Sequence, residues 1–288
     1  MRVGLELLKL TRSAGAGSIF VVGIGRDVGK TMALRAIYSA AYDAGARIGL
    51  ASCGVGASRK PRLWLSPQTV FVTTRLSLPP TPAAQIIDVS ALQNPSGALL
   101  YARVISAGLY ELAGPPTASG MREVVAALQN LTDTVIVDGA VDRVAALAGS
   151  AGAVIVSCGA AAAKTMQEAV DDVSALVERL RVRQFNPAEP AYHLDGALTA
   201  SIAGALIAGR DDRQIVVGDP TQIALSGKAG SRVLGRLRVR CRHPLRVVAA
   251  TVASIGPERS FEPRALARAV AAATGLPTFD VYANALAA

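Results

Sequence analysis

The residues with the clearest chemical potential in this chain are three glycines, a lysine and a threonine. Gly23, Gly25 and Gly29 stand directly before Lys30 and Thr31. Glycines let backbone N–H groups converge on phosphate oxygens, a lysine reaches β- and γ-phosphates, and a hydroxyl binds Mg²⁺. The stretch therefore predicts a loop that binds ATP together with Mg²⁺.

The spacing of this loop departs from the strict pattern G-x-x-x-x-G-K-[ST]. The first glycine of that pattern falls on Ile24, which has a glycine on either side. The competing interpretation is an ordinary tight turn between a strand and a helix. The candidate nucleotide-binding residues are Gly23, Gly25, Arg26, Asp27, Val28, Gly29, Lys30 and Thr31, with Lys30 also a catalytic candidate and Thr31 a metal ligand.

A second candidate, Asp138, follows a β-branched run. Val135-Ile-Val137 leads straight into this aspartate and Gly139. A carboxylate at the end of such a strand can hold Mg²⁺, directly or through water, beside a phosphate loop. A strand that ends in Asp-Gly is also a common turn, but the loop at 23–31 favours a metal and catalytic role. Asp142 and Arg143 could orient water, contact phosphate or pair with each other.

The elements that must position these residues alternate between strand and helix. Expected strands lie at 19–22, 46–52, 69–74, 132–138 and 153–156, and expected helices at 31–44, 121–131 and 160–182. This alternation predicts an α/β fold with a mostly parallel sheet, helices on both faces and a P-loop NTPase-like organisation.

The rest of the chain gives weaker signals. Residues 1–17 read as an amphipathic lead-in, and 98–105 is expected to form a hairpin with 109–112. Residues 18–210 are expected to form the nucleotide-binding domain. From 211 to 288 the pattern predicts a C-terminal α/β region, with short strands at 214–218 and 222–225, as an appendage or as part of the same domain.

Two basic stretches have no assigned role. The loop Gly54–Pro61 carries Arg59 and Lys60 and leads to Arg62, so it predicts either a phosphate or acidic-substrate contact or a solvated loop. Arginines at 236, 238, 240 and 242 alternate with apolar residues. A strand there would show all four on one face, as an acidic-partner or nucleic-acid surface or as a protected sheet edge.

Composition narrows the classes of partner and cellular location that the protein can have. The 288 residues carry a net charge of +9, but only 4% are aromatic, so base stacking is poorly supplied and nucleic-acid binding is not expected. Three separated cysteines support neither a disulfide framework nor a zinc site. No stretch predicts a membrane span, and the N-terminus lacks a signal-peptide pattern, which predicts a cytoplasmic protein.

Two motifs resemble those of dethiobiotin synthetase-like P-loop proteins. The loop Gly23–Thr31 is similar in its glycine and lysine spacing, and Val137-Asp-Gly-Ala140 is similar to the acid-Gly-Ala that ends a strand in that superfamily. The glycine that usually follows is replaced by Val141-Asp142.

A longer resemblance is to the small reactivase subunit found with lysine 5,6-aminomutase and ornithine aminomutase. The matching segments are Gly25–Thr31, Lys60–Arg62, Glu111–Pro115, Val137–Arg143 and Pro277–Val281. The resemblance implies an ATP-binding accessory protein that works with a MutS-like ATPase subunit to restore a cobalamin- and PLP-dependent aminomutase. It implies that Gly29, Lys30 and Thr31 bind nucleotide and that Asp138 is the acid after the strand. The Gly54–Ser58 loop does not match the pattern of that family. The sequence is also compatible with a homodimer.

Two other functions compete with this interpretation. One is a dethiobiotin synthetase-like ligase that activates a carboxylate with ATP, with the basic loop at 59–62 binding substrate. The other is a nucleotide-gated regulatory ATPase that uses the arginine strand. A GTPase is disfavoured because the chain has no N-K-x-D motif.

Overall fold

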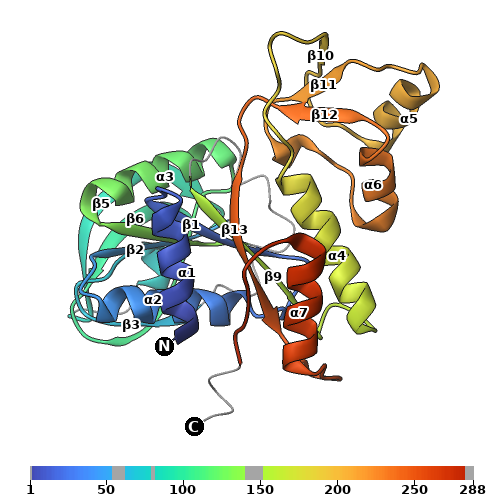
Figure 1. Ribbon diagram of the computed structural model, residues 1–288. Coiled ribbons are helices and arrows are strands. Elements are labelled where there is room, and N and C mark those ends of the chain that lie inside the picture. Colours follow the sequence, from blue (N-terminus) through green and yellow to red (C-terminus); the bar gives the residue numbers. More distant parts are fainter. Residues whose placement is uncertain (1, 54–61, 79–81, 140–151, 283–288) are drawn as a thin grey trace. The chain divides into compact units, whose positions relative to one another are not determined.

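The computed structural model describes residues 2–53, 62–78, 82–139 and 152–282 (Figure 1). Over these residues the chain has an α/β fold with seven α-helices and a large, mostly parallel mixed sheet. The described residues divide into two compact units. The first holds 2–22 and 30–139, and the second holds 23–29 and 152–282.

The first unit is built on parallel strands that are buried on both faces. Its strand order is β1-β8-β2-β4-β6-β5. Neighbours from β1 to β4 pair in parallel, whereas β6 is antiparallel to both β4 and β5. The strands are β1 (Ser18–Gly23), β2 (Ile48–Ser52), β4 (Val70–Thr74), β5 (Ala84–Asn94), β6 (Gly97–Val104) and β8 (Thr134–Asp138). Every residue of β1, β2 and β4 is buried, as expected for continuous apolar runs in a parallel sheet.

Three helices belong to this unit, α1 (Arg2–Ser13), α2 (Lys30–Asp43) and α3 (Ala118–Leu131). The expected amphipathic lead-in is confirmed as α1, which buries Leu7 and Leu8. Gly4 lies so close to α2 that an added Cβ would stand 1.9 Å from the backbone oxygen of Ala36. The packing of α1 on α2 therefore depends on the missing side chain at position 4.

The expected hairpin between 98–105 and 109–112 is wrong. Instead, β7 (Gly108–Glu111) pairs with β3 (Arg62–Leu65), while β6 lies between β4 and β5. Leu99 to Ala102 are buried in succession, which suits an interior strand, and the hairpin partner of β6 is the preceding strand β5. Arg62, a candidate phosphate contact, is exposed and forms an ion pair with Glu111 at 2.6 Å.

The second unit has a parallel set of three strands and a smaller parallel sheet. The first set has the order β14-β13-β9, comprising β9 (Ala153–Gly159), β13 (Arg246–Ala253) and β14 (Thr278–Asp280), with α4 (Met166–Leu180) and α7 (Pro263–Thr274). The small sheet has the order β10-β11-β12, comprising β10 (Ala191–His193), β11 (Gln214–Val217) and β12 (Arg238–Cys241), with α5 (Ala200–Ala208) and α6 (Gly227–Leu234).

The region after residue 211 thus contributes to both sheets, since β11 and β12 join the small sheet while β13 and β14 lie beside β9. The arginine strand is shorter than expected, because Arg236 and Arg242 fall outside β12. Inside it the alternation is confirmed, with Arg238 exposed and Val239 buried. The stretch 222–225 is not a strand: a 3-10 turn at Pro220–Gln222 leads to one isolated bridge at Ile223.

We predict that Gly4→Ala destabilises the protein, although alanine favours a helix by about 1 kcal/mol. The new methyl group must displace the backbone of α2, which costs about 1–3 kcal/mol net. Urea unfolding measures the change. Gly204→Ala in α5 is the matched control, because nothing lies within 4 Å of its added Cβ, and it should be neutral or stabilising. Equal effects of the two substitutions would contradict the packing argument.

Candidate functional site

The loop between β1 and α2 has the strand, loop and helix order that the sequence predicts. Residues 24–29 are irregular, and α2 begins at Lys30. Asp27 and Gly29 have left-handed backbones, with φ of 54° and 87°. When right-handed and left-handed residues follow one another, their N–H groups can point into one concavity that binds an anion.

Close packing within the second unit explains two of the loop glycines. A Cβ on Gly25 would lie 2.8 Å from Cβ of Ala162, and one on Gly29 would lie 2.9 Å from Cβ of Ala253. Val28 is fully buried, whereas Arg26 and Asp27 are exposed. The loop is therefore anchored by Val28, while its tip remains open to solvent.

Several backbone N–H groups of this loop make no hydrogen bond to the described residues. The N–H of Ile24 donates to the carbonyl of Ser157 at 3.1 Å. Further along the loop, the N–H groups of residues 26–29 have no hydrogen-bond partner among the residues that the structure describes. Four consecutive N–H groups just before a helix start are therefore available to water or to an anion.

Asp138 lies at the carboxyl ends of two neighbouring parallel strands in the first unit. In the strand register it stands opposite Val21 of β1 and Ser52 of β2. The N–H of Gly139 donates to the carbonyl of Val21 at 2.9 Å, and the N–H of Cys53 donates to the carbonyl of Asp138 at 2.8 Å. The carboxyl ends of parallel strands are where α/β sheets bind ligands.

The electrostatics of Asp138 are unusual for an aspartate. Burial raises its pKa to about 6, and the positive charge of Lys30 acts in the opposite direction. Because the desolvation effect prevails, the carboxylate is held in an environment that disfavours its negative charge. A buried acid beside a lysine is a typical signature of a functional site.

The predicted site residues divide between the two units. Lys30, Thr31 and Asp138 belong to the first, with Thr31 exposed, and 23–29 belong to the second. The loop Gly54–Pro61, Asp142 and Arg143 lie outside the described residues. Within the described ranges, no group of three or more His, Cys, Asp or Glu side chains could hold a metal ion. Mg²⁺ bound mainly by phosphate and water needs no such group.

Sequence reasoning missed the residues that support the loop from the end of β9. Besides accepting from Ile24, Ser157 shares a buried 2.7 Å hydroxyl hydrogen bond with Thr251. A Cβ on Gly159 would lie 3.2 Å from Cα of Val28. The segment Ser157-Cys-Gly159 was visible as a strand end, but nothing in its composition indicates a contact with a loop 130 residues earlier in the chain.

Among known proteins, no family model, no curated protein and no solved structure matches this chain. Over the described residues, no helix combines the length and apolarity that crossing a membrane demands. Inference about function therefore starts from the loop and Asp138 themselves.

We predict that Asp138→Asn stabilises the protein without nucleotide at pH 8 and that this gain shrinks as the pH falls. The folded pKa of about 6 lies above the unfolded value, so the stabilising contribution of the bound proton is complete near pH 4. As the pH rises from about 4 through about 6, the free energy of unfolding therefore falls by up to about 3 kcal/mol. Urea unfolding between pH 4 and 8 measures this dependence, and a difference that does not vary with pH would contradict it.

Proposed function

We propose that this chain binds Mg-ATP through Gly23 to Thr31, with Asp138 as the acid that supports the metal. One observation carries the proposal: the N–H groups of residues 26–29 have no partner among the described residues, and they directly precede Lys30, whose charge acts on a buried carboxyl group. A polyphosphate supplies the negative charge that these N–H groups favour. Mg²⁺ supplies the positive charge that favours the ionised form of Asp138.

Each residue has a distinct part in this proposal. The N–H groups of Arg26 to Gly29 hold phosphate oxygens, and Lys30 pairs with the β- and γ-phosphates. The exposed hydroxyl of Thr31 binds Mg²⁺, and Asp138 holds the ion directly or through water. Bound Mg²⁺ would neutralise phosphate charge and orient the γ-phosphate. The raised pKa of Asp138 makes metal binding compete with a proton below about pH 6.

The cellular role that we propose is that of an accessory subunit, acting in the cytoplasm. Resemblance to the small aminomutase reactivase subunit supports a MutS-like ATPase as partner and a cobalamin- and PLP-dependent aminomutase as client. The described parts of two resembling segments, Gly25–Thr31 and Val137–Gly139, contribute the loop and the acid of the candidate site. In this role the nucleotide changes affinity for partners, and the chain alone hydrolyses ATP slowly or not at all.

Lys30→Ala should abolish the stabilisation by Mg-ATP while leaving the melting temperature without nucleotide nearly unchanged. Native protein at about 100-fold the dissociation constant should gain about 2.7 kcal/mol. Differential scanning fluorimetry with Mg-ATP and Mg-GTP measures the shift. Lys9→Ala is the matched control, because Lys9 is exposed on α1 and, within the described part of the chain, pairs only with its helical neighbour Glu6. An undiminished shift in Lys30→Ala would show that the loop is only a turn.

The same assay separates the metal role of Asp138 from a structural one. Asp138→Asn should weaken ATP binding with Mg²⁺ present and change it little in EDTA, because the carboxylate acts through the ion. The native Mg-ATP shift should also decline as the pH falls below about 6, in line with the raised pKa. Equal losses with Mg²⁺ and with EDTA would assign Asp138 to the fold.

Reactivation tests the proposed role. A cobalamin-dependent aminomutase inactivated by turnover would be given adenosylcobalamin and Mg-ATP with this protein, with a MutS-like subunit, with both or with neither. We expect recovery only with both proteins, and none when Lys30→Ala replaces the native chain. Mg-ATP binding without recovery would preserve the nucleotide site and refute the reactivase role. Brisk ATP turnover with a diamine and bicarbonate alone would establish the ligase function in its place.

A further inference from the structure

The small sheet of the second unit has an open edge at β10. The N–H of Gln214 donates to the carbonyl of Pro190 at 3.0 Å, and the N–H of Leu194 donates to the carbonyl of Val216 at 2.9 Å. Because alternate residues of a parallel strand face opposite neighbours, Ala191 and His193 direct their N–H and C=O groups away from β11. These backbone groups have no partner among the described residues.

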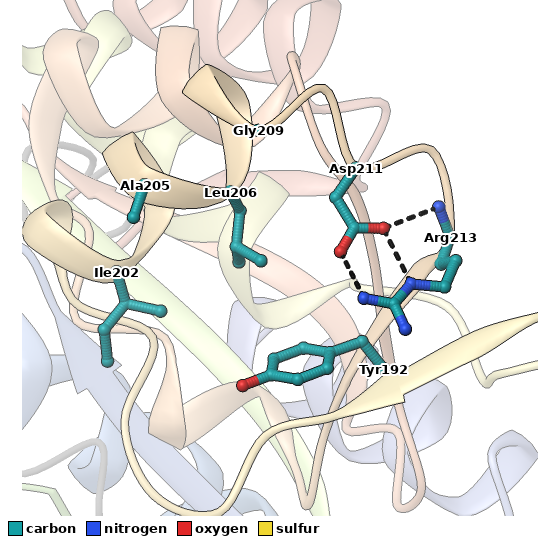
Figure 2. Close-up of a pocket in the computed structure, with 7 residues that line it drawn as sticks. All are labelled: Tyr192, Ile202, Ala205, Leu206, Gly209, Asp211 and Arg213. Atoms are coloured by element: carbon teal, nitrogen blue, oxygen red, sulfur yellow. Dashed lines mark hydrogen bonds and ion pairs between the residues drawn. The ribbon is translucent and has the colours of Figure 1, made fainter.

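A groove lies between this edge strand and helix α5. Its volume is about 520 Å³, and Figure 2 shows the Tyr192 ring facing the side chains of Leu206 and Ile202 on the helix. At one end Arg213 forms an ion pair with Asp211 at 2.6 Å and places its guanidinium carbon 5.3 Å from the centre of the Tyr192 ring. The full lining is Tyr192, Ile202, Ala205, Leu206, Gly209, Asp211 and Arg213.

Helix α5 shows small residues to solvent, while its larger apolar residues pack toward the small sheet. Its sequence, Ala-Ser-Ile-Ala-Gly-Ala-Leu-Ile-Ala, has no charged residue, yet only Ala203 is buried. Surface helices normally place charged residues on the outer face. The neighbouring helix α6 has Lys228 and Arg232 exposed there. The half-buried Ile202 and Leu206 thus form one wall of the groove, and the exposed small residues of α5 leave the groove open to a ligand.

An exposed arginine beside the open edge favours a carboxylate on the occupant. The positive charge of the small-sheet region lies between residues 228 and 246, which hold seven Lys and Arg and no Asp or Glu, whereas residues 184–227 hold two Arg and five Asp and Glu. Arg242 is exposed, and its Nη2 lies 3.2 Å from Nδ1 of His193 on the open edge. Over the described residues Arg242 has no ion pair with a carboxylate.

We propose that the β10 edge and the groove beside α5 bind an extended, acidic peptide segment of a partner protein as an added strand. The peptide backbone pairs with Ala191 and His193, an apolar side chain enters the groove, and a carboxylate meets Arg242. Only a polypeptide in extended form satisfies all three features. A lipid surface leaves the polar edge unpaired, and single-stranded nucleic acid finds only Tyr192 as a stacking platform in the groove.

A selection from random nonapeptides displayed on phage tests the proposal with the full-length chain as target. We expect enrichment of acidic peptides with apolar residues at alternate positions. The enriched sequence, synthesised with a fluorescent label, should bind in an anisotropy titration. Its analogue with N-methylated backbone amides should bind about tenfold more weakly or worse, because it cannot pair with a strand edge.

Two pairs of variants locate the binding surface. Ala205→Arg fills the groove from an exposed helix position, and Ala208→Arg is the control, because Ala208 is exposed on α5 but does not line the groove. Ala191→Pro removes an N–H group that is free of the sheet, and Ala200→Pro is the control outside β10, because Ala200 is the first residue of α5, where proline is tolerated, and it does not line the groove. Ala205→Arg and Ala191→Pro should each weaken binding about tenfold, and the controls should change it less than about twofold.

Three results would overturn the proposal: no enrichment above background, an enriched peptide that binds both groove and edge variants as well as the native chain, or an N-methylated peptide that binds unchanged. Binding of anionic phosphatidylglycerol vesicles or of a single-stranded oligonucleotide at ~150 mM salt, lost in Ala205→Arg, would replace the peptide with that ligand. Melting temperatures of all variants confirm that each is folded before binding is compared.

Discussion

The parallel pairing of β1 with β8 is the constraint on which the candidate site depends. It fixes Asp138 opposite Val21, two residues before the loop begins, and the N–H of Gly139 extends the pairing by one more hydrogen bond. The carboxylate is thereby held where water cannot solvate it fully, and its pKa rises to about 6. The fold thus accepts an electrostatic cost at this position that a bound cation would remove.

The glycines of the loop follow from contacts with distant parts of the chain as much as from the turn itself. Gly25 approaches Ala162, and Gly29 approaches Ala253 while also holding a φ of 87°. A side chain at Gly29 would therefore meet both a clash and backbone strain. Gly25 has only the steric constraint. Asp27 shares the left-handed backbone, with a φ of 54°, but the side chains of Arg26 and Asp27 are both exposed and can face a ligand.

Much of this site was predictable because it is encoded locally. The run into Gly23, the lysine that begins α2 and the β-branched run into Asp138 each lie within a few residues, and the predicted elements around them form. Pairing partners were not predictable in the same way: β6 and β7 follow one another through a short turn, yet each pairs elsewhere. Apolar periodicity reports that a strand is buried, but not which strand buries it. The support of the loop by Ser157 was missed for the same reason.

The two proposed binding surfaces rely on the same chemistry, unpaired backbone N–H groups, but they differ in what the sequence can reveal of them. A loop that frees four consecutive N–H groups needs glycine and left-handed backbone, as at Gly29, so it leaves a mark in the residue types. A strand edge needs only an extended backbone, which almost any residue adopts, and Ala191-Tyr-His193 carries no motif. Topology alone leaves β10 at an edge, because β11 is its one neighbour in the small sheet over the described residues. What the sequence does show beside that edge is a helix without charged residues, Ala200–Ala208. Its larger apolar residues pack against the core of the small sheet, so the fold explains their presence, and the unpaired strand edge is the feature that calls for a partner.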